Sequence, residues 1–186
     1  MEDRPEFREW PSIARLSRDI IVTEKIDGTS SQIHITDLGN VYAGSRTRWI
    51  TPQDDNFGFA KWVEVNAEGL RTELGPGTHF GEWYGQGIQR NYGLKEKRFA
   101  LFNTTRWKDA PRLICDVVPV LYEGPFDTVV IDQLLDSLAA LGSFITPGFK
   151  AEGIVVFHTK ANVMFKKTLD HNDLHKSSIK PLDPRA

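Results

Sequence analysis

The chain has 186 residues, of which 40% are apolar and 26% charged, and its formal net charge is −2 at pH 7. This length and composition are typical of one globular domain, which we expect to span residues 1–186 with a short tail from about residue 169. The small negative charge excludes a global positive field that attracts nucleic acid. Binding to nucleic acid would therefore need a local basic face.

The sequence carries no sign of membrane insertion or secretion. No apolar stretch approaches the ~20 residues that a membrane-spanning helix needs, and the N-terminus is charged rather than signal-like. The single cysteine, Cys115, cannot form an internal disulfide and lies in an apolar run, where a thiol is most often buried. We therefore expect a cytoplasmic protein without a membrane partner.

Strands outnumber helices in the pattern of apolar residues along the chain. Alternation of apolar and polar residues predicts strands, in chain order, at residues 20–25, 32–36, 41–45, 78–84, 99–103, 113–120, 153–158 and 162–167. Helical spacing predicts one helix at residues 56–70 and another at 127–141, the latter capped by Asp127 and ended by Gly142. This order favours an α+β fold with mostly antiparallel sheets and flanking helices.

The segment most suggestive of chemistry lies at the end of the first predicted strand, where Lys25 is followed by Asp27 and Gly28. Alternation places Lys25 and Asp27 on one face, and Gly28 allows the chain to turn tightly. Taken alone, such a tetrapeptide is most often a strand end with an ordinary turn. A catalytic interpretation needs support from elsewhere in the chain.

Five later motifs supply that support, because they follow in a fixed order over most of the chain. The full series reads Lys25-Ile26-Asp27-Gly28, Gly44-Ser45-Arg46-Thr47, Phe80-Gly81-Glu82-Trp83, Phe99-Ala100-Leu101-Phe102, Ala151-Glu152-Gly153-Ile154-Val155 and Met164-Phe165-Lys166-Lys167. It resembles the covalent nucleotidyltransferase superfamily of DNA ligases, RNA ligases and mRNA capping enzymes. Each motif alone would be read as an ordinary core or surface segment, but six in order are a far stronger signal.

The resemblance implies a ligase-type, ATP-grasp-like nucleotidyltransferase domain in which Lys25 takes AMP from ATP. By the same resemblance, Glu82 would hydrogen-bond the ribose, Phe102 would stack on the adenine, and Arg46 would reach the ribose or the acceptor strand. Ile26 belongs to the nucleotide-binding motif. Glu24, directly before the nucleophile, would help to select adenine through its side chain or its backbone carbonyl.

The proposed chemistry explains why lysines and a carboxylate recur in these motifs. A lysine must be neutral to attack phosphorus, whereas free lysine titrates near ~10.4, so such sites use burial or a nearby cation. Lys166 is the candidate cation. Lys166, with Lys167 as the other candidate, and a divalent Mg²⁺ or Mn²⁺ would stabilise charge on the phosphoryl oxygens. Glu152 is the expected metal-proximal carboxylate.

Two positions depart from the family pattern. The lysine motif usually alternates lysine, any residue, lysine, but here Lys166 and Lys167 are adjacent and Thr168 holds the alternate position. Adjacent strand residues face opposite ways, so we expect only one lysine, Lys166, to face the phosphate. DNA ligases usually carry an arginine two residues after the motif glycine, whereas this chain has Ser30, which favours the RNA ligase branch.

Basic residues outside the motifs are candidates for RNA contacts. They are Arg46, Arg48, Arg90, Lys95 and Lys97. The alternative interpretation of the cluster around residues 90–98 is a solvated hairpin tip, and the sequence does not decide between the two.

The sequence therefore predicts a minimal ATP-dependent RNA ligase without an OB domain. Its substrate would be RNA with a 5′-phosphate and a 3′-hydroxyl, and a helper protein or domain could be needed to grip the ends. A DNA nick ligase is one alternative, against which Ser30 counts. A non-catalytic nucleotide- or RNA-binding module is the other, and the intact Lys25, Glu82, Glu152 and Lys166 count against it.

Overall fold

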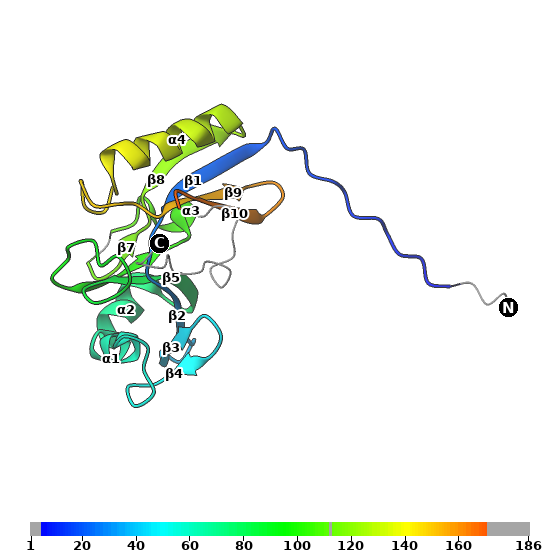
Figure 1. Cartoon of the computed structure of the whole chain (residues 1–186). Coiled ribbons are helices and arrows are strands. Elements are labelled where there is room, and N and C mark those ends of the chain that lie inside the picture. Colours follow the sequence, from blue (N-terminus) through cyan, green and yellow to red (C-terminus); the bar gives the residue numbers. More distant parts are fainter. Residues whose placement is uncertain (1–4, 112, 171–186) are drawn as a thin grey trace, which may run out of the picture.

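The computed structural model describes residues 5–111 and 113–170 (Figure 1). Two mostly antiparallel sheets form the body of the protein, with helices on their outer sides, which confirms the predicted α+β class. The predicted tail from about residue 169 lies almost wholly outside the described residues. Within the described residues, no helix is long and apolar enough to cross a membrane.

The first sheet has four strands in the order β10-β9-β1-β8, all antiparallel to their neighbours. Its strands are β1 (Asp19–Lys25), β8 (Val120–Pro125), β9 (Gly153–His158) and β10 (Val163–Thr168). One face carries Ile20 and Val22 of β1, which are fully buried against α4 (Thr128–Leu141). This helix lies over the sheet on the side away from the second sheet (Figure 1).

The second sheet has six strands in the order β4-β3-β2-β5-β6-β7, of which only β6 and β7 pair in parallel. Its strands are β2 (Thr29–Ile35), β3 (Val41–Ser45), β4 (Trp49–Ile50), β5 (Gly77–Gly85), β6 (Lys97–Leu101) and β7 (Asp116–Val117). Odd-numbered residues of β2, including Ile33 and Ile35, pack into a core with α1 (Phe59–Val65) and α2 (Ala67–Leu74). A short helix, α3 (Thr104–Trp107), follows β6.

A third, smaller core joins the two sheets where β1 passes into β2. It contains Ile26, Tyr84, Tyr92, Ala100 and Val118, all buried. The chain therefore leaves the first sheet at Lys25 and enters the second at Thr29 across a packed junction. This crossover sets the position of Lys25-Ile26-Asp27-Gly28, here named the nucleophile motif after its expected role.

The predicted helix at residues 56–70 is wrong in its bounds. The structure has two helices that meet at Asn66, and the second extends to Leu74. The Asn66 side chain donates a hydrogen bond of 2.8 Å to the carbonyl of Trp62. A side chain that competes for backbone groups in this way favours a helix end.

The predicted strand at residues 113–120 is also wrong in its bounds. Leu113 is 96% exposed, and the N–H groups of Leu113, Ile114 and Cys115 all donate to the carboxylate of Glu73 at 2.8–3.0 Å. Because these donors are bound to a side chain, they form no sheet ladder. Strand pairing begins only at β7 and resumes in β8, which extends to Pro125.

Candidate active site

Lys25 is the last residue of β1 and lies in register with Gly153 of β9. Its Nζ donates a hydrogen bond of 2.7 Å to Oε2 of Glu152, the residue directly before β9. The side chain of Glu152 is 6% exposed and that of Lys25 is 22% exposed. The pair is thus partly shielded from water, which strengthens the interaction between the two charges.

The turn after Lys25 is held by hydrogen bonds from its backbone. The N–H of Asp27 donates to the hydroxyl of Tyr92 at 2.7 Å, and the N–H of Gly28 donates to Oε1 of Glu82 at 3.2 Å. Position 28 has no room for a side chain, because a Cβ there would lie 2.4 Å from the carbonyl oxygen of Trp83. The glycine of the motif is therefore required by the close approach of the turn to β5.

Glu82 is a buried carboxylic acid in the middle of this arrangement. Burial raises its pKa to about 7, while the charge of Lys25 and hydrogen bonds from Ser30 and Gly28 act in the opposite direction. The hydroxyl of Ser30 donates to Oε2 of Glu82 at 3.3 Å. Glu82 thus takes up and releases its proton near neutral pH.

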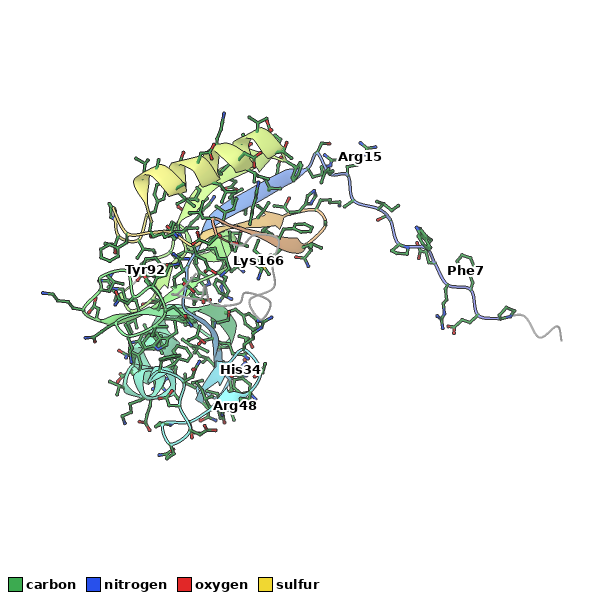
Figure 2. The ribbon with its side chains drawn as sticks, in the orientation of Figure 1. Phe7, Arg15, His34, Arg48, Tyr92 and Lys166 are labelled. Atoms are coloured by element: carbon green, nitrogen blue, oxygen red, sulfur yellow. The ribbon has the colours of Figure 1, made fainter. Side chains whose placement is uncertain are left out.

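The register of the four-stranded sheet decides which lysine of β10 shares a face with Lys25. Lys166 is paired with Val155 of β9, and Val155 is paired with Thr23 of β1, two residues before Lys25. All three lie on the Lys25 face because side chains alternate along a strand. Figure 2 shows Lys166 on the four-stranded sheet, near the middle of the molecule.

Lys167 points to the opposite face of β10. Its Nζ forms an ion pair of 2.5 Å with Asp132 of α4. The structure therefore separates the two adjacent lysines, placing Lys166 on the face of the nucleophile motif and Lys167 against the helix.

Phe102 lies on the face of the six-stranded sheet that also carries Glu82. Its N–H donates to the carbonyl of Phe80 at 3.0 Å, and Ala100, two residues earlier, is paired with Glu82. Phe102 is 39% exposed, so part of its surface is accessible to a ligand. Ile26, in contrast, is buried in the core between the sheets.

The Glu24 side chain is already bound within the protein. Ser143 Oγ donates to its Oε1 at 2.5 Å, and the N–H of Phe144 donates to its Oε2 at 2.8 Å. Burial raises the pKa of Glu24, while these hydrogen bonds act to lower it. Both oxygens of the Glu24 carboxylate are thus engaged in hydrogen bonds within the protein.

The basic residues predicted to contact RNA do not form one cluster. Arg90 lies at the nucleophile motif, where its Nε is 3.0 Å from Oδ2 of Asp27. Lys97 donates to the carbonyl of Phe57, and Arg48 is paired with Asp54. Two candidates, Arg46 and Lys95, are exposed, and within residues 5–111 and 113–170 no ion pair involves them.

A divalent metal, as the resemblance implies, fits the acidic residues here only in part. In the described part of the chain, no group of three or more His, Cys, Asp or Glu residues could hold a metal ion by itself. Mg²⁺ is commonly held by one or two carboxylates together with substrate phosphates and water. Glu152, buried beside Lys25, is suited to supply one carboxylate to that kind of shared site, though not to a protein cage.

The six sequence motifs do not include Tyr92, and they give Val155 no role of its own. Tyr92 holds the turn through its hydroxyl, and Val155 lies between Thr23 and Lys166 on the Lys25 face. Strand alternation from Gly153, which is paired with Lys25, places Val155 of the fifth motif on the Lys25 face. Tyr92 lies in an irregular loop with no periodic pattern, so no sequence signal marks it.

A comparison with protein-family models matches residues 18–169 to the RNA ligase family. The chain belongs to the RNA ligase family. The match begins just before β1 and ends after β10, so it includes all the motifs of the site. A search of the curated proteins found no match for this RNA ligase family member.

Solved structures of Naegleria gruberi RNA ligase share the fold. A mutant without ligand matches with a TM-score of 0.62 and 21% identity over 86% of this chain and 53% of that chain. A mutant with ATP and Mn matches with a TM-score of 0.61 and 21% identity over 82% of this chain and 50% of that chain. The form with PPi matches with a TM-score of 0.60 and 22% identity over 85% of this chain and 53% of that chain. The present chain thus spans about half the length of those proteins.

Proposed function

We propose that this RNA ligase family member is an ATP-dependent RNA ligase that carries AMP on Lys25. It joins an RNA 5′-phosphate to a 3′-hydroxyl in three steps. The observation that carries the proposal is the juxtaposition of Lys25 with Glu152, 2.7 Å apart, on the sheet face that also holds Lys166. A nucleophile beside a proton acceptor and a cation is the arrangement that attack on a phosphate requires.

In the first step, Glu152 accepts a proton from Nζ of Lys25, to which it is already hydrogen-bonded. The neutral amine attacks the α-phosphorus of ATP, so a nitrogen–phosphorus bond forms while the bond to the bridging oxygen breaks. Pyrophosphate leaves with the bonding electron pair. Lys166 would stabilise the negative charge on the phosphoryl oxygens.

In the second step, an oxygen of the RNA 5′-phosphate attacks the AMP phosphorus and the bond to Lys25 breaks. In the third, the RNA 3′-hydroxyl attacks the 5′-phosphorus, loses its proton and releases AMP. Both steps exchange one phosphorus bond for another, so no oxidant or reductant is needed.

The remaining site residues would bind the nucleotide. Phe102 offers a partly exposed ring to adenine, Glu82 a carboxyl group to the ribose, and Arg46 an exposed guanidinium to the ribose or the acceptor strand. A divalent metal, held by Glu152 and the phosphates, would supply positive charge to the phosphate oxygens. Complexes of the Naegleria enzyme with ATP and Mn, with AMP and Mn, and with PPi support the assignment of ATP as the substrate.

Covalent labelling tests the first step directly. The purified chain, freed of bound AMP with pyrophosphate, is incubated with α-labelled ATP and Mg²⁺ and then denatured in acid and detergent. We expect label on the wild type and none on Lys25→Ala or Lys25→Arg, because a guanidinium is not a nucleophile. Lys160→Ala, at an exposed lysine of the β9–β10 hairpin, is the matched control and should label normally. Label on Lys25→Ala, or none on a folded wild type, would overturn the proposal.

The acceptor is identified with the isolated labelled protein. Release of label by 5′-phosphorylated RNA, followed by joining, supports an RNA ligase. Release by nicked DNA alone would make the chain a DNA nick ligase. ATP binding without covalent label would leave a nucleotide-binding module.

A further inference from the structure

The face of the six-stranded sheet that carries Glu82 and Phe102 continues outward as a row of aromatic side chains that are exposed or half-buried. His34, Tyr42, Trp49 and Phe80, here named the aromatic platform, come from β2, β3, β4 and β5. Tyr42 is 49% exposed, and Trp49 and Phe80 are each 56% exposed. Large aromatic rings are normally buried, so four on one face need an explanation.

Strand register shows that these residues share one face. His34 is paired with Tyr42, and Gln32 is paired both with Phe80 and with Gly44, which in turn is paired with Trp49. Residues of the opposite parity, including Ile33 and Ala43, are buried against the helices. The helices therefore cover only the other face of the sheet.

The rings form a contiguous surface. The centroids of His34, Tyr42 and Trp49 lie 6.1–6.5 Å from one another, with interplanar angles of 36–60°. A hydrogen bond of 2.8 Å between Nδ1 of His34 and the hydroxyl of Thr78 fixes the imidazole. The rings thus support one another at the edge of the sheet, while Tyr42 and Trp49 keep about half of their surface exposed.

The platform is continuous with the candidate active site. Phe80 is two residues from Glu82 on β5, and its carbonyl accepts from the N–H of Phe102. Along β2, Ser30 lies beside Glu82, and His34 lies four residues farther on. A strand whose end lies at Lys25 can therefore run over Phe80 towards Trp49 without leaving this face.

Positive charge borders the outer end of the platform. The hairpin between β3 and β4 carries Arg46 and Arg48, directly before Trp49. Arg48 is held by Asp54, while Arg46 has no ion-pair partner in the portion of the chain that is described. Figure 2 shows His34 over these strands with Arg48 nearby.

Exposed aromatic rings next to a phosphate-binding cation are typical of sites for single-stranded nucleic acid. Unpaired bases stack on such rings, whereas the bases of a duplex hide their faces within the helix. We propose that the aromatic platform binds the unpaired bases of the RNA strand that leads away from the joined end. The choice of RNA rests on the proposed function, while the stacking surface rests on the geometry.

Fluorescence anisotropy tests the platform with a labelled single-stranded oligoadenylate RNA of about 12 nucleotides, a typical site size. Hydroxyl groups at both ends prevent adenylylation and joining. Tyr42→Ala/Trp49→Ala should raise Kd at least about tenfold, since each base stack is worth about 1–3 kcal/mol. Tyr42→Phe/Trp49→Phe keeps both rings and should restore most of the affinity.

Phe7→Ala removes an exposed ring far from the platform and should bind as the wild type does (Figure 2). A fully paired RNA hairpin should bind the wild type more weakly than the single strand. Arg46→Ala should reduce the slope of log K against log salt by about 0.7, the value for one phosphate contact on a single strand.

Equal affinity of the alanine double variant and the wild type would overturn the proposal, as would absence of single-strand binding or a preference for the duplex. Labelling of Lys25 by ATP needs no RNA and is measured on the same samples. Loss of labelling in the wild type with intact platform binding would therefore remove the proposed ligase function but leave the platform.

Discussion

Nζ of Lys25 donates a hydrogen bond of 2.7 Å to Oε2 of Glu152, although the two residues lie 127 positions apart in the sequence. The bond exists because Lys25 ends β1 and Glu152 precedes β9, and these strands are antiparallel neighbours. It connects the first and the fifth of the six sequence motifs. The pairing of β1 with β9 thus brings together two motifs that lie far apart along the chain.

This pair should show strong energetic coupling. Glu152→Gln leaves the Lys25 ammonium without its counter-charge, and we expect a loss of about 1–3 kcal/mol in the free energy of unfolding. The double variant Lys25→Met/Glu152→Gln should lose less free energy of unfolding than the two single variants do in sum. In the double variant both charges of the pair are removed, so no partner is left unpaired. Urea unfolding of the four proteins measures the coupling. Additive effects would show that the hydrogen bond contributes nothing to stability.

The elevated pKa of Glu82 predicts a pH dependence of stability. The folded pKa is about 7, against 4.5 without the fold, so the folded state retains a proton that the unfolded state has released. Stability from this group is fully present below about pH 4.5 and is lost as pH rises to 7, by on the order of 3 kcal/mol. Glu82→Gln, which cannot titrate, should remove this decline.

The contribution of Glu82 is measured as the difference in the free energy of unfolding between wild type and Glu82→Gln at each pH. His79 acts in the opposite direction, since burial lowers its pKa from 6.5 and stability therefore rises with pH in an overlapping range. The difference curve cancels that contribution. A flat difference between pH 4.5 and 7 would contradict the assignment. Lys25→Met should shift the stability loss caused by Glu82 to higher pH, because the charge of Lys25 lowers the pKa of Glu82.

Adjacent lysines of β10 should differ sharply in function. Lys166→Ala should slow labelling of Lys25 by at least about tenfold, because Lys166 shares the Lys25 face and would stabilise the phosphoryl charge. Lys167→Ala removes only a surface ion pair with Asp132, and such pairs contribute about 0–1 kcal/mol. Single-turnover labelling compares the two variants. Equal loss in both would mean that the face assignment does not govern chemistry.

Local patterns in the sequence predicted much of this fold. Strands β1, β3, β5 and β9 and helix α4 lie within a residue or two of the predicted bounds, because alternation and capping depend on near neighbours. Asp127 caps α4 as predicted, accepting from the N–H of Val129 at 2.8 Å. Alternation alone also predicted that Lys166 and Lys167 face opposite ways, and the register confirms it.

Long-range side-chain bonds account for what the sequence did not predict. The strand predicted from residue 113 fails because Glu73, far away in sequence, binds the N–H groups needed for pairing. Arg90, whose role the sequence left open between an RNA contact and a solvated hairpin tip, forms an ion pair with Asp27 that the sequence did not predict. Neither partner can be identified from periodicity, since these contacts depend on how separate elements pack.

Gly28 should tolerate no side chain. Gly28→Ala places a Cβ 2.4 Å from a backbone oxygen of β5, which cannot move without disturbing the sheet. We expect a loss of at least about 3 kcal/mol, at the upper end of overpacking costs. Gly148→Ala is the control, because nothing lies within 4 Å and only its positive φ of 85° opposes alanine. That substitution should cost about 1 kcal/mol. Similar melting of the two variants would refute the steric argument.

Arg90 should act as a positioning residue for the nucleophile motif. Its guanidinium spans Asp27 at 3.0 Å and Asp170 at 3.5 Å, and so ties the turn after Lys25 to the segment that follows β10. Arg90→Ala should slow labelling of Lys25 by about tenfold or more while the Kd for ATP changes little, because only the placement of the turn is lost. Arg90→Lys should recover only part of the rate, since an ammonium cannot span both carboxylates. Asp170→Asn, which keeps the Asp27 contact, should be milder than Arg90→Ala. If Arg90→Ala labels at the wild-type rate, the turn is held by Tyr92 and Glu82 alone.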